Sequence, residues 1–274
     1  MIPEQEKKKS RREFLIASTA ITTGLVVATI FKPFKSIAES QSSDSSSLNV
    51  DSNKSEVKNP LKKNTDEWYG FGFDIDKCIG CGSCASACKS ENNVPTEPFF
   101  FRTWVEQYTE KNDGTLKVQS PNGGIDEQKQ TVPDKDIFKS YFVPKTCNHC
   151  YKSPCTQVCP VGATFVSPEG IVLIDEKYCI GCGYCVQACP YGCRYIHPVK
   201  EVADKCTLCY HRIKQGLPPA CVEVCPTGAR IHGNLHDKSS DLVKFIKEHN
   251  CHVLKPHLNT GSKLFYNSLN EEVR

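Results

Sequence analysis

The 18 cysteines of this 274-residue chain are not scattered, because 16 of them fall into four groups of four. Every group ends in the spacing C-x3-C, and three of the four continue directly into proline. The groups, in chain order, are Cys78, Cys81, Cys84, Cys88; Cys147, Cys150, Cys155, Cys159; Cys179, Cys182, Cys185, Cys189; and Cys206, Cys209, Cys221, Cys225. Few folds can bring so many thiols together in four places.

The spacing of these groups indicates iron-sulfur chemistry. In bacterial ferredoxins, three thiolates of a C-x2-C-x2-C-x3-C-P run hold one [4Fe-4S] cluster, and the fourth reaches the other cluster of a pair. All sixteen positions are cysteine, so we expect four [4Fe-4S] clusters and no three-iron cluster. A structural protein built on zinc or disulfides is an alternative, but zinc sites usually take two separated pairs of ligands rather than four on one loop.

The N-terminus resembles a twin-arginine export signal. Ser10-Arg11-Arg12 follows three lysines and precedes an uncharged stretch over residues 14–31, and small residues around Ala38 offer a cleavage point. We expect residues 1–38 to be a removed signal peptide. A retained membrane anchor is the alternative, since about 20 apolar residues can span a bilayer.

Export of a folded chain agrees with the cysteine content. Clusters must be built on reduced thiols, which an oxidising compartment would instead pair as disulfides. We therefore expect the twin-arginine translocase to carry the folded protein to the periplasm. Residues 1–38 hold seven of the 34 basic and three of the 31 acidic side chains, so the remaining chain has a formal charge of −1. It lacks a basic stripe with interleaved aromatic residues, and we do not expect nucleic-acid binding.

The rest of the chain is organised by repetition. One repeated segment is Cys78-Ile79-Gly80-Cys81-Gly82, which matches Cys179-Ile180-Gly181-Cys182-Gly183. A second repeat, the tail Cys-Pro-x-Gly, begins at residues 159, 189 and 225. Proline is expected to end a short helix that carries the fourth cysteine, and glycine to permit the turn that follows. Two β-branched runs flank the turn sequence at residues 167–170, which predicts a hairpin.

These signals predict an α+β fold of two fused bacterial-type double-cluster ferredoxin modules over residues 68–234. Within it, residues from about 98 to 145 form an insert between the first two cysteine groups. Residues 39–67 are polar with almost no apolar side chains, which predicts a flexible linker. Residues 235–274 are expected to form a C-terminal extension that packs on the domain.

Several longer motifs are characteristic as a set: Cys78-Ile79-Gly80-Cys81, Glu91-Asn92-Asn93-Val94-Pro95, Thr146-Cys147-Asn148-His149-Cys150, Asp204-Lys205-Cys206-Thr207-Leu208-Cys209 and Val253-Leu254-Lys255-Pro256. With them, the chain resembles the four-cluster iron-sulfur subunit of the dimethyl sulfoxide reductase family of molybdopterin oxidoreductases. The resemblance covers roughly residues 70–267.

The resemblance implies a crossed ligand scheme, in which the first group shares two clusters with the fourth and the second shares two with the third. The implied ligand sets are Cys78, Cys81, Cys84 and Cys225 for cluster 1; Cys147, Cys150, Cys155 and Cys189 for cluster 2; Cys179, Cys182, Cys185 and Cys159 for cluster 3; and Cys206, Cys209, Cys221 and Cys88 for cluster 4. This pairing comes from the resemblance alone.

The resemblance also implies a function in electron transfer. Iron with four cysteine ligands offers a substrate no open position, so we expect a subunit that is not itself catalytic. It would relay single electrons between an integral membrane quinone-reactive subunit and a catalytic molybdopterin or tungstopterin subunit, and it would be held at the membrane through a partner. A free-standing periplasmic polyferredoxin is the alternative.

Three further residues could be mistaken for ligands. His149 lies within the second group, which already has four cysteines, so we expect it to pack beside the cluster or to hydrogen bond there. Cys193 and Cys251 fall outside the groups. We expect both to be buried free thiols, with a disulfide between them or to another chain as the alternatives.

Overall fold

The computed structural model describes residues 66–97, 100–270 and 273. The expected signal peptide and nearly all of the expected linker lie outside the described residues. The strands are β1 (Tyr69–Asp74), β2 (Thr103–Lys111), β3 (Leu116–Gln119), β4 (Ile137–Thr146), β5 (Thr164–Val166), β6 (Val172–Ile174), β7 (Tyr195–Ile196), β8 (Ala203–Asp204), β9 (Arg230–Asn234) and β10 (Leu264–Asn267). The helices are α2 (Ser83–Asn92), α3 (Pro154–Gln157), α4 (Tyr184–Gln187), α5 (Tyr210–Ile213), α6 (Ala220–Glu223) and α7 (Asp241–Glu248), with short 3-10 turns η1 (Pro121–Gly124), η2 (Asp134–Asp136) and η3 (Pro256–Leu258).

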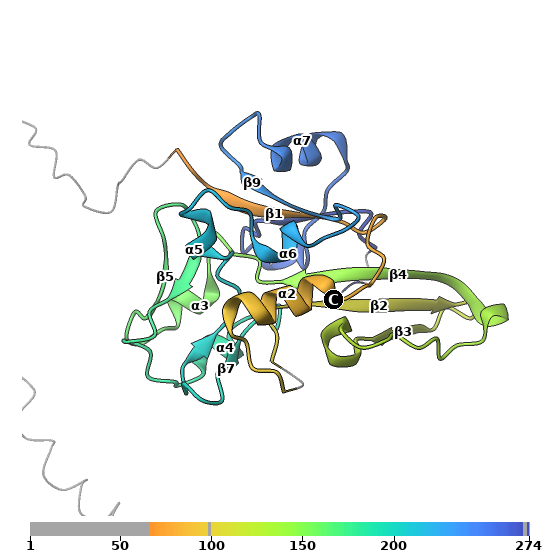
Figure 1. Ribbon diagram of the computed structural model, residues 1–274, viewed down its shortest axis with the longest axis horizontal. Helices are drawn as coiled ribbons and strands as arrows, with labels where there is room; N and C mark the ends of the chain where they lie inside the picture. Colours follow the sequence, from red (N-terminus) through yellow and green to blue (C-terminus); the bar gives the residue numbers. More distant parts are fainter. Residues whose placement is uncertain (1–65, 98–99, 271–272, 274) are drawn as a thin grey trace, which may run out of the picture. The chain divides into compact units, whose positions relative to one another are not determined.

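A three-stranded sheet joins the beginning of the described chain to its end. β1 is the central strand, with β9 antiparallel on one side and β10 parallel on the other. Phe71 and Phe73 are fully buried in the core beside Leu264. α7 covers the opposite face of β1, where a Cβ on Gly72 would lie 2.7 Å from the ring of Phe245. Glycine therefore lets the helix approach the strand closely (Figure 1).

A second sheet lies within the expected insert and has the strand order β3-β2-β4. β2 and β4 run side by side over most of their length (Figure 1). β4 is an edge strand, which tolerates Pro144 because proline cannot donate a ladder hydrogen bond. β4 ends at Thr146, directly before Cys147. The sheet therefore leads the chain straight into the second cysteine group.

Two small hairpins separate the later cysteine groups. β5 pairs antiparallel with β6, in the register Thr164 to Ile174, which confirms the hairpin predicted from the turn at residues 167–170. β7 pairs with β8 in the same manner. The glycines of the three Cys-Pro-x-Gly tails, Gly162, Gly192 and Gly228, all have φ between 64° and 66°, as the turn prediction requires.

The short helices end earlier than predicted. α3, α4 and α6 each contain the third cysteine of a group, Cys155, Cys185 and Cys221, and end two residues before the fourth. The prediction that these helices carry the fourth cysteine is therefore wrong. A residue that precedes proline is pushed out of the helical region of backbone space, so the helix must stop before that cysteine. Cys88 is followed by lysine instead, and it remains inside α2.

Among the described residues, no helix combines the length and the apolar character needed to cross a lipid bilayer. The apolar stretch at residues 14–31 lies outside that part of the chain.

Candidate functional site

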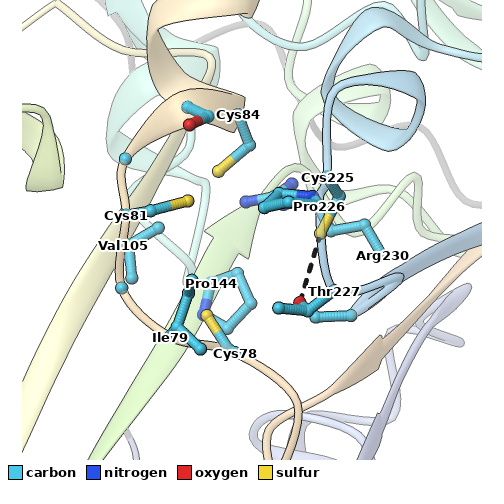
Figure 2. A pocket seen from close by; sticks show the side chains of 14 residues that line it. Cys78, Ile79, Cys81, Cys84, Val105, Pro144, Cys225, Pro226, Thr227 and Arg230 are labelled. Atoms are coloured by element: carbon cyan, nitrogen blue, oxygen red, sulfur yellow. Dashed lines mark hydrogen bonds between the residues drawn. The ribbon is translucent and has the colours of Figure 1, made fainter.

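The first and fourth cysteine groups meet at one pocket. Its lining includes the four thiols expected to bind cluster 1: Cys78, Cys81, Cys84 and Cys225. The loop between β1 and α2 contributes Cys78 and Cys81, the first turn of α2 contributes Cys84, and the turn after α6 contributes Cys225. Cys81 and Cys84 lie on one side of the pocket and Cys225 on the other (Figure 2). Val105 and Pro144 of the inserted sheet complete the wall.

The same two groups also meet at a second pocket. Its lining includes the four thiols expected to bind cluster 4: Cys88, Cys206, Cys209 and Cys221. The Asn92 side-chain nitrogen lies 3.6 Å from the Cys88 sulfur and 3.7 Å from the Cys209 sulfur. Each group thus exchanges its fourth cysteine with the other, since Cys225 turns to the first pocket and Cys88 to the second.

The thiols expected to bind cluster 2 are also neighbours. Burial, together with the charges of Cys147, Cys155 and Cys189, raises the pKa of Cys150 to about 12. Cys189 behaves differently: a hydrogen bond from Cys193 and backbone N–H groups lower its pKa to about 6. Burial also raises the pKa of Cys155, so Cys189 loses its proton more readily than Cys150 and Cys155 do.

Two thiols of the set expected for cluster 3 are neighbours. Cys185 is buried in a small apolar cluster with Val172 and Ala203, and the half-buried Cys179 packs against it. Cys182 is exposed. Cys159 follows α3, which packs against α4, and its membership of this set stays a prediction.

The pockets have the chemistry that an iron-sulfur cluster needs. Burial raises the pKa of Cys78 to about 11 and that of Cys221 to about 12, so several thiolates in one buried site are stable only when cations balance their charge. Iron supplies such charge, and the thiolate is the form that binds metal. Among the described residues that line either pocket, no carboxylate competes with the thiols. The residues present therefore fit a cluster at each pocket.

Among the described histidine, cysteine, aspartate and glutamate side chains, no three converge closely enough to hold a single metal ion. The thiols instead surround the space of each pocket.

Buried cations beside the thiols were missed by sequence reasoning, because arginine and lysine are mostly surface residues. Arg194 donates from Nη2 to the Cys155 sulfur at 3.0 Å. Arg102 lines the second pocket and pairs with Asp204 at 2.8 Å, and Arg230 lines the first pocket. The available signal was position, since Arg194 and Arg230 each stand five residues after the last cysteine of a group.

Two of the three residues set aside in the sequence, His149 and Cys193, are buried. His149 is buried, its Nδ1 accepts a hydrogen bond from the Val172 N–H at 3.1 Å, and burial holds its pKa well below the ordinary value. Cys193 is a buried free thiol that donates to the Thr146 carbonyl at 3.0 Å. Cys251 is a half-buried free thiol, so the expected burial holds only in part.

Comparison with known proteins agrees with this geometry. Two protein-family models, both described as 4Fe-4S dicluster domains, match residues 77–163 and 138–235. Two clusters for each domain give four [4Fe-4S] clusters in the chain. The B subunit of the tetrathionate reductase of Salmonella typhimurium is 41% identical over 205 residues, covering 74% of this chain and 73% of the relative. The B subunit of the Archaeoglobus fulgidus tetrathionate reductase is 43% identical over 222 residues, covering 81% of this chain and 92% of the relative.

A third relative, the B subunit of the polysulfide reductase of Wolinella succinogenes, is 35% identical over 198 residues, covering 72% of this chain and 92% of the relative. These matches extend across both halves of the cysteine-bearing region, as the resemblance to the dimethyl sulfoxide reductase family predicted. The chain belongs to the family of iron-sulfur B subunits of tetrathionate, polysulfide and related reductases.

Proposed function

We propose that this chain relays single electrons through four [4Fe-4S] clusters between a membrane quinone-reactive subunit and a catalytic molybdopterin or tungstopterin subunit. The chain is an electron-transfer subunit and not the catalytic one, as its relatives' family indicates. The observation that carries the proposal is that thiols from distant cysteine groups meet at shared pockets. Four thiols line the first pocket and four line the second.

The proposed ligands follow the crossed scheme. Clusters 1 and 4 take the first and fourth cysteine groups, which exchange Cys225 and Cys88. Clusters 2 and 3 take the second and third groups, which exchange Cys189 and Cys159. When bound, each cluster supplies a centre that gains and loses one electron without an open position for substrate.

The chain's own residues shield most of the proposed ligands from water and leave two of them exposed. Most of the ligand thiols are buried, which excludes water, whereas Cys81 and Cys182 are exposed. These two cysteines occupy matching positions of the Cys-Ile-Gly-Cys-Gly repeat. One belongs to cluster 1 and the other to cluster 3, so each crossed pair has one cluster that a partner subunit can approach.

The partners and the location are part of the proposal. The relatives are named as B components of reductases, which supports a catalytic partner for this chain as well. The arginine pair and apolar stretch near the N-terminus support export of the folded chain by the twin-arginine translocase and a periplasmic position at the membrane. The alternative is a free-standing periplasmic polyferredoxin.

Metal analysis of the natural complex tests the function. The full chain would be tagged at its C-terminus, purified anaerobically from native membranes, and analysed for iron, molybdenum, tungsten and zinc. We expect about 16 irons per chain, four for each cluster, together with molybdenum or tungsten from the partner. The full iron content in a chain that comes away alone would support the free carrier instead, and zinc in place of iron would overturn the cluster assignment.

A further inference from the structure

Two arginines occupy the same position of the repeated tail. The segments Cys189-Pro190-Tyr191-Gly192-Cys193-Arg194 and Cys225-Pro226-Thr227-Gly228-Ala229-Arg230 align residue for residue. In the third such tail, which begins at Cys159, the position is taken by Thr164. Arg194 and Arg230 are only 5% and 3% exposed. Arginine is almost never so deeply buried unless its charge is balanced.

Arg230 connects the two pockets of the first crossed pair, since it lines the first and its Nη2 donates to Thr103, which lines the second. It lines the first pocket (Figure 2). Burial opposes its charge, but the charges of Cys84, Cys221 and Cys78 outweigh this and raise its pKa. Cys84 and Cys78 belong to the first pocket, whereas Cys221 belongs to the second. One guanidinium therefore faces thiols of both.

The contacts of Arg230 fix its position, but they leave one of its hydrogen-bond donors without an acceptor among the described residues. Its Nη2 donates to Thr103 Oγ1 at 2.9 Å, and its guanidinium carbon lies 4.4 Å from the centre of the Phe73 ring. Its Nη1 is buried and has no hydrogen-bond partner among the described residues. An unpaired buried donor is costly, so this nitrogen requires an acceptor, and the sulfur atoms of a bound cluster are acceptors in the pocket that Arg230 lines.

Arg194 has the matching position in the second crossed pair. Its Nη2 donates to the Cys155 sulfur at 3.0 Å, and its Nη1 lies 3.4 Å from Thr164 Oγ1. Burial again opposes the charge, while the charges of Cys155, Cys147 and Cys185 raise its pKa. Cys155 and Cys147 belong to the cluster 2 set and Cys185 to the cluster 3 set. Both arginines thus rest against a threonine hydroxyl and face two thiol sets.

We propose that Arg194 and Arg230 set the reduction potentials of the clusters, each guanidinium lying between the two clusters of one crossed pair and raising the potential of both. This inference rests on the proposed cluster assignment. A reduced cluster carries one more negative charge than an oxidised one, so a fixed positive charge beside it stabilises the reduced form. The effect is strong in a poorly polarisable interior, and hydrogen bonds to the sulfurs act in the same direction.

The test measures potentials as well as iron. Arg230→Met and Arg194→Met would be made in the full chain, with Arg→Lys at both positions to keep the charge. Lys244→Met is the control, since it removes a positive charge from the exposed side of α7. Iron content is measured first, and EPR-monitored redox titration of the anaerobic protein then gives the potential of each cluster.

We expect each Met variant to keep its full iron content. Each should lower the reduction potential of two of the four clusters, which favours their oxidised form, and the two variants should affect different pairs. A tenfold shift in that equilibrium corresponds to about 59 mV for one electron. The Lys variants should stay closer to the natural potentials, and Lys244→Met should change none. Met variants with full iron and unchanged potentials, or with equal shifts in all four clusters, would overturn the inference.

Iron content separates the other outcomes. Fewer than four clusters in the natural chain would refute the proposed function itself. If a Met variant loses iron while its Lys variant keeps it, the positive charge is needed beside the clusters, which supports the inference. If the Met and Lys variants both lose iron, the guanidinium acts as a structural brace, and the inference is wrong.

Discussion

Gly82 and Gly183 show how one backbone conformation can serve two packing environments. They occupy matching positions in two cysteine loops, and both are left-handed, with φ of 68° and 76°. A Cβ on Gly82 would lie 2.0 Å from the carbonyl oxygen of Gly124, whereas nothing lies within 4 Å of a Cβ on Gly183. The first loop therefore needs glycine for conformation and for space, and the third loop needs it for conformation only.

Alanine substitutions should separate these two needs. Gly183→Ala should cost about 1–2 kcal/mol, the penalty of the left-handed conformation, and should leave the iron content unchanged. Gly82→Ala adds a clash with backbone that cannot move aside cheaply, so it should lower the unfolding temperature further and remove about four of the 16 irons. Thermal unfolding and iron analysis of both variants check this, and equal losses in the two would contradict it.

Local sequence signals predicted some elements and missed others for physical reasons. The β5–β6 hairpin is encoded by a turn between β-branched runs and was predicted. The parallel pairing of β1 with β10 was not, because it joins the two ends of the described chain and has no local signature. The cysteine groups were predicted from spacing, whereas Arg194 and Arg230 were missed, since their burial depends on thiols contributed by other segments.

A histidine on strand β9 should make the stability of its sheet depend on pH. His232 lies opposite Phe71 in the register with β1, and burial lowers its pKa below the ordinary 6.5. The unfolded chain therefore takes up a proton more readily than the folded chain. The stabilisation is present above about pH 6.5 and is lost as the pH falls through the lower pKa of the folded state.

Replacement of this histidine should reduce that dependence. His232→Gln should narrow the fall in unfolding temperature between about pH 7 and about pH 5, because the side chain can no longer take up a proton. The exposed His257 on η3 gives a matched control, His257→Gln, which should unfold as the natural chain does. An unfolding temperature that falls just as steeply in His232→Gln would exclude His232 as the cause.

At the scale of the whole molecule, the crossed thiols couple distant segments. Cys78 follows the first strand and Cys225 precedes the ninth, yet both line one pocket. Neither pocket exists until segments far apart in the sequence have come together, so folding and cluster binding should be strongly coupled, as in other small metal domains.

Paired substitutions test the crossing directly. Cys78→Ala and Cys225→Ala should remove or alter the same EPR signal of the reduced protein, and Cys88→Ala and Cys206→Ala should share a different one. The reason is that each cluster takes three thiolates from one group and the fourth from the other. If the Cys78 and Cys88 variants altered the same signal, each group would bind its own cluster, and the crossed scheme would be incorrect.

The inserted sheet contributes none of the proposed cluster ligands, yet its strand register helps to set the distance between the two proposed pairs of clusters. Val105 of β2 and Pro144 of β4 face each other in that register and form part of the wall of the first pocket. Three residues beyond Pro144 stands Cys147, which the proposed scheme assigns to the second pair. A slip of β4 by one residue would turn Pro144 to the opposite face and move Cys147 relative to that wall. In the proposed scheme, the backbone hydrogen bonds of this sheet therefore help to set the spacing between the two pairs of clusters, although the sheet supplies none of the proposed ligands.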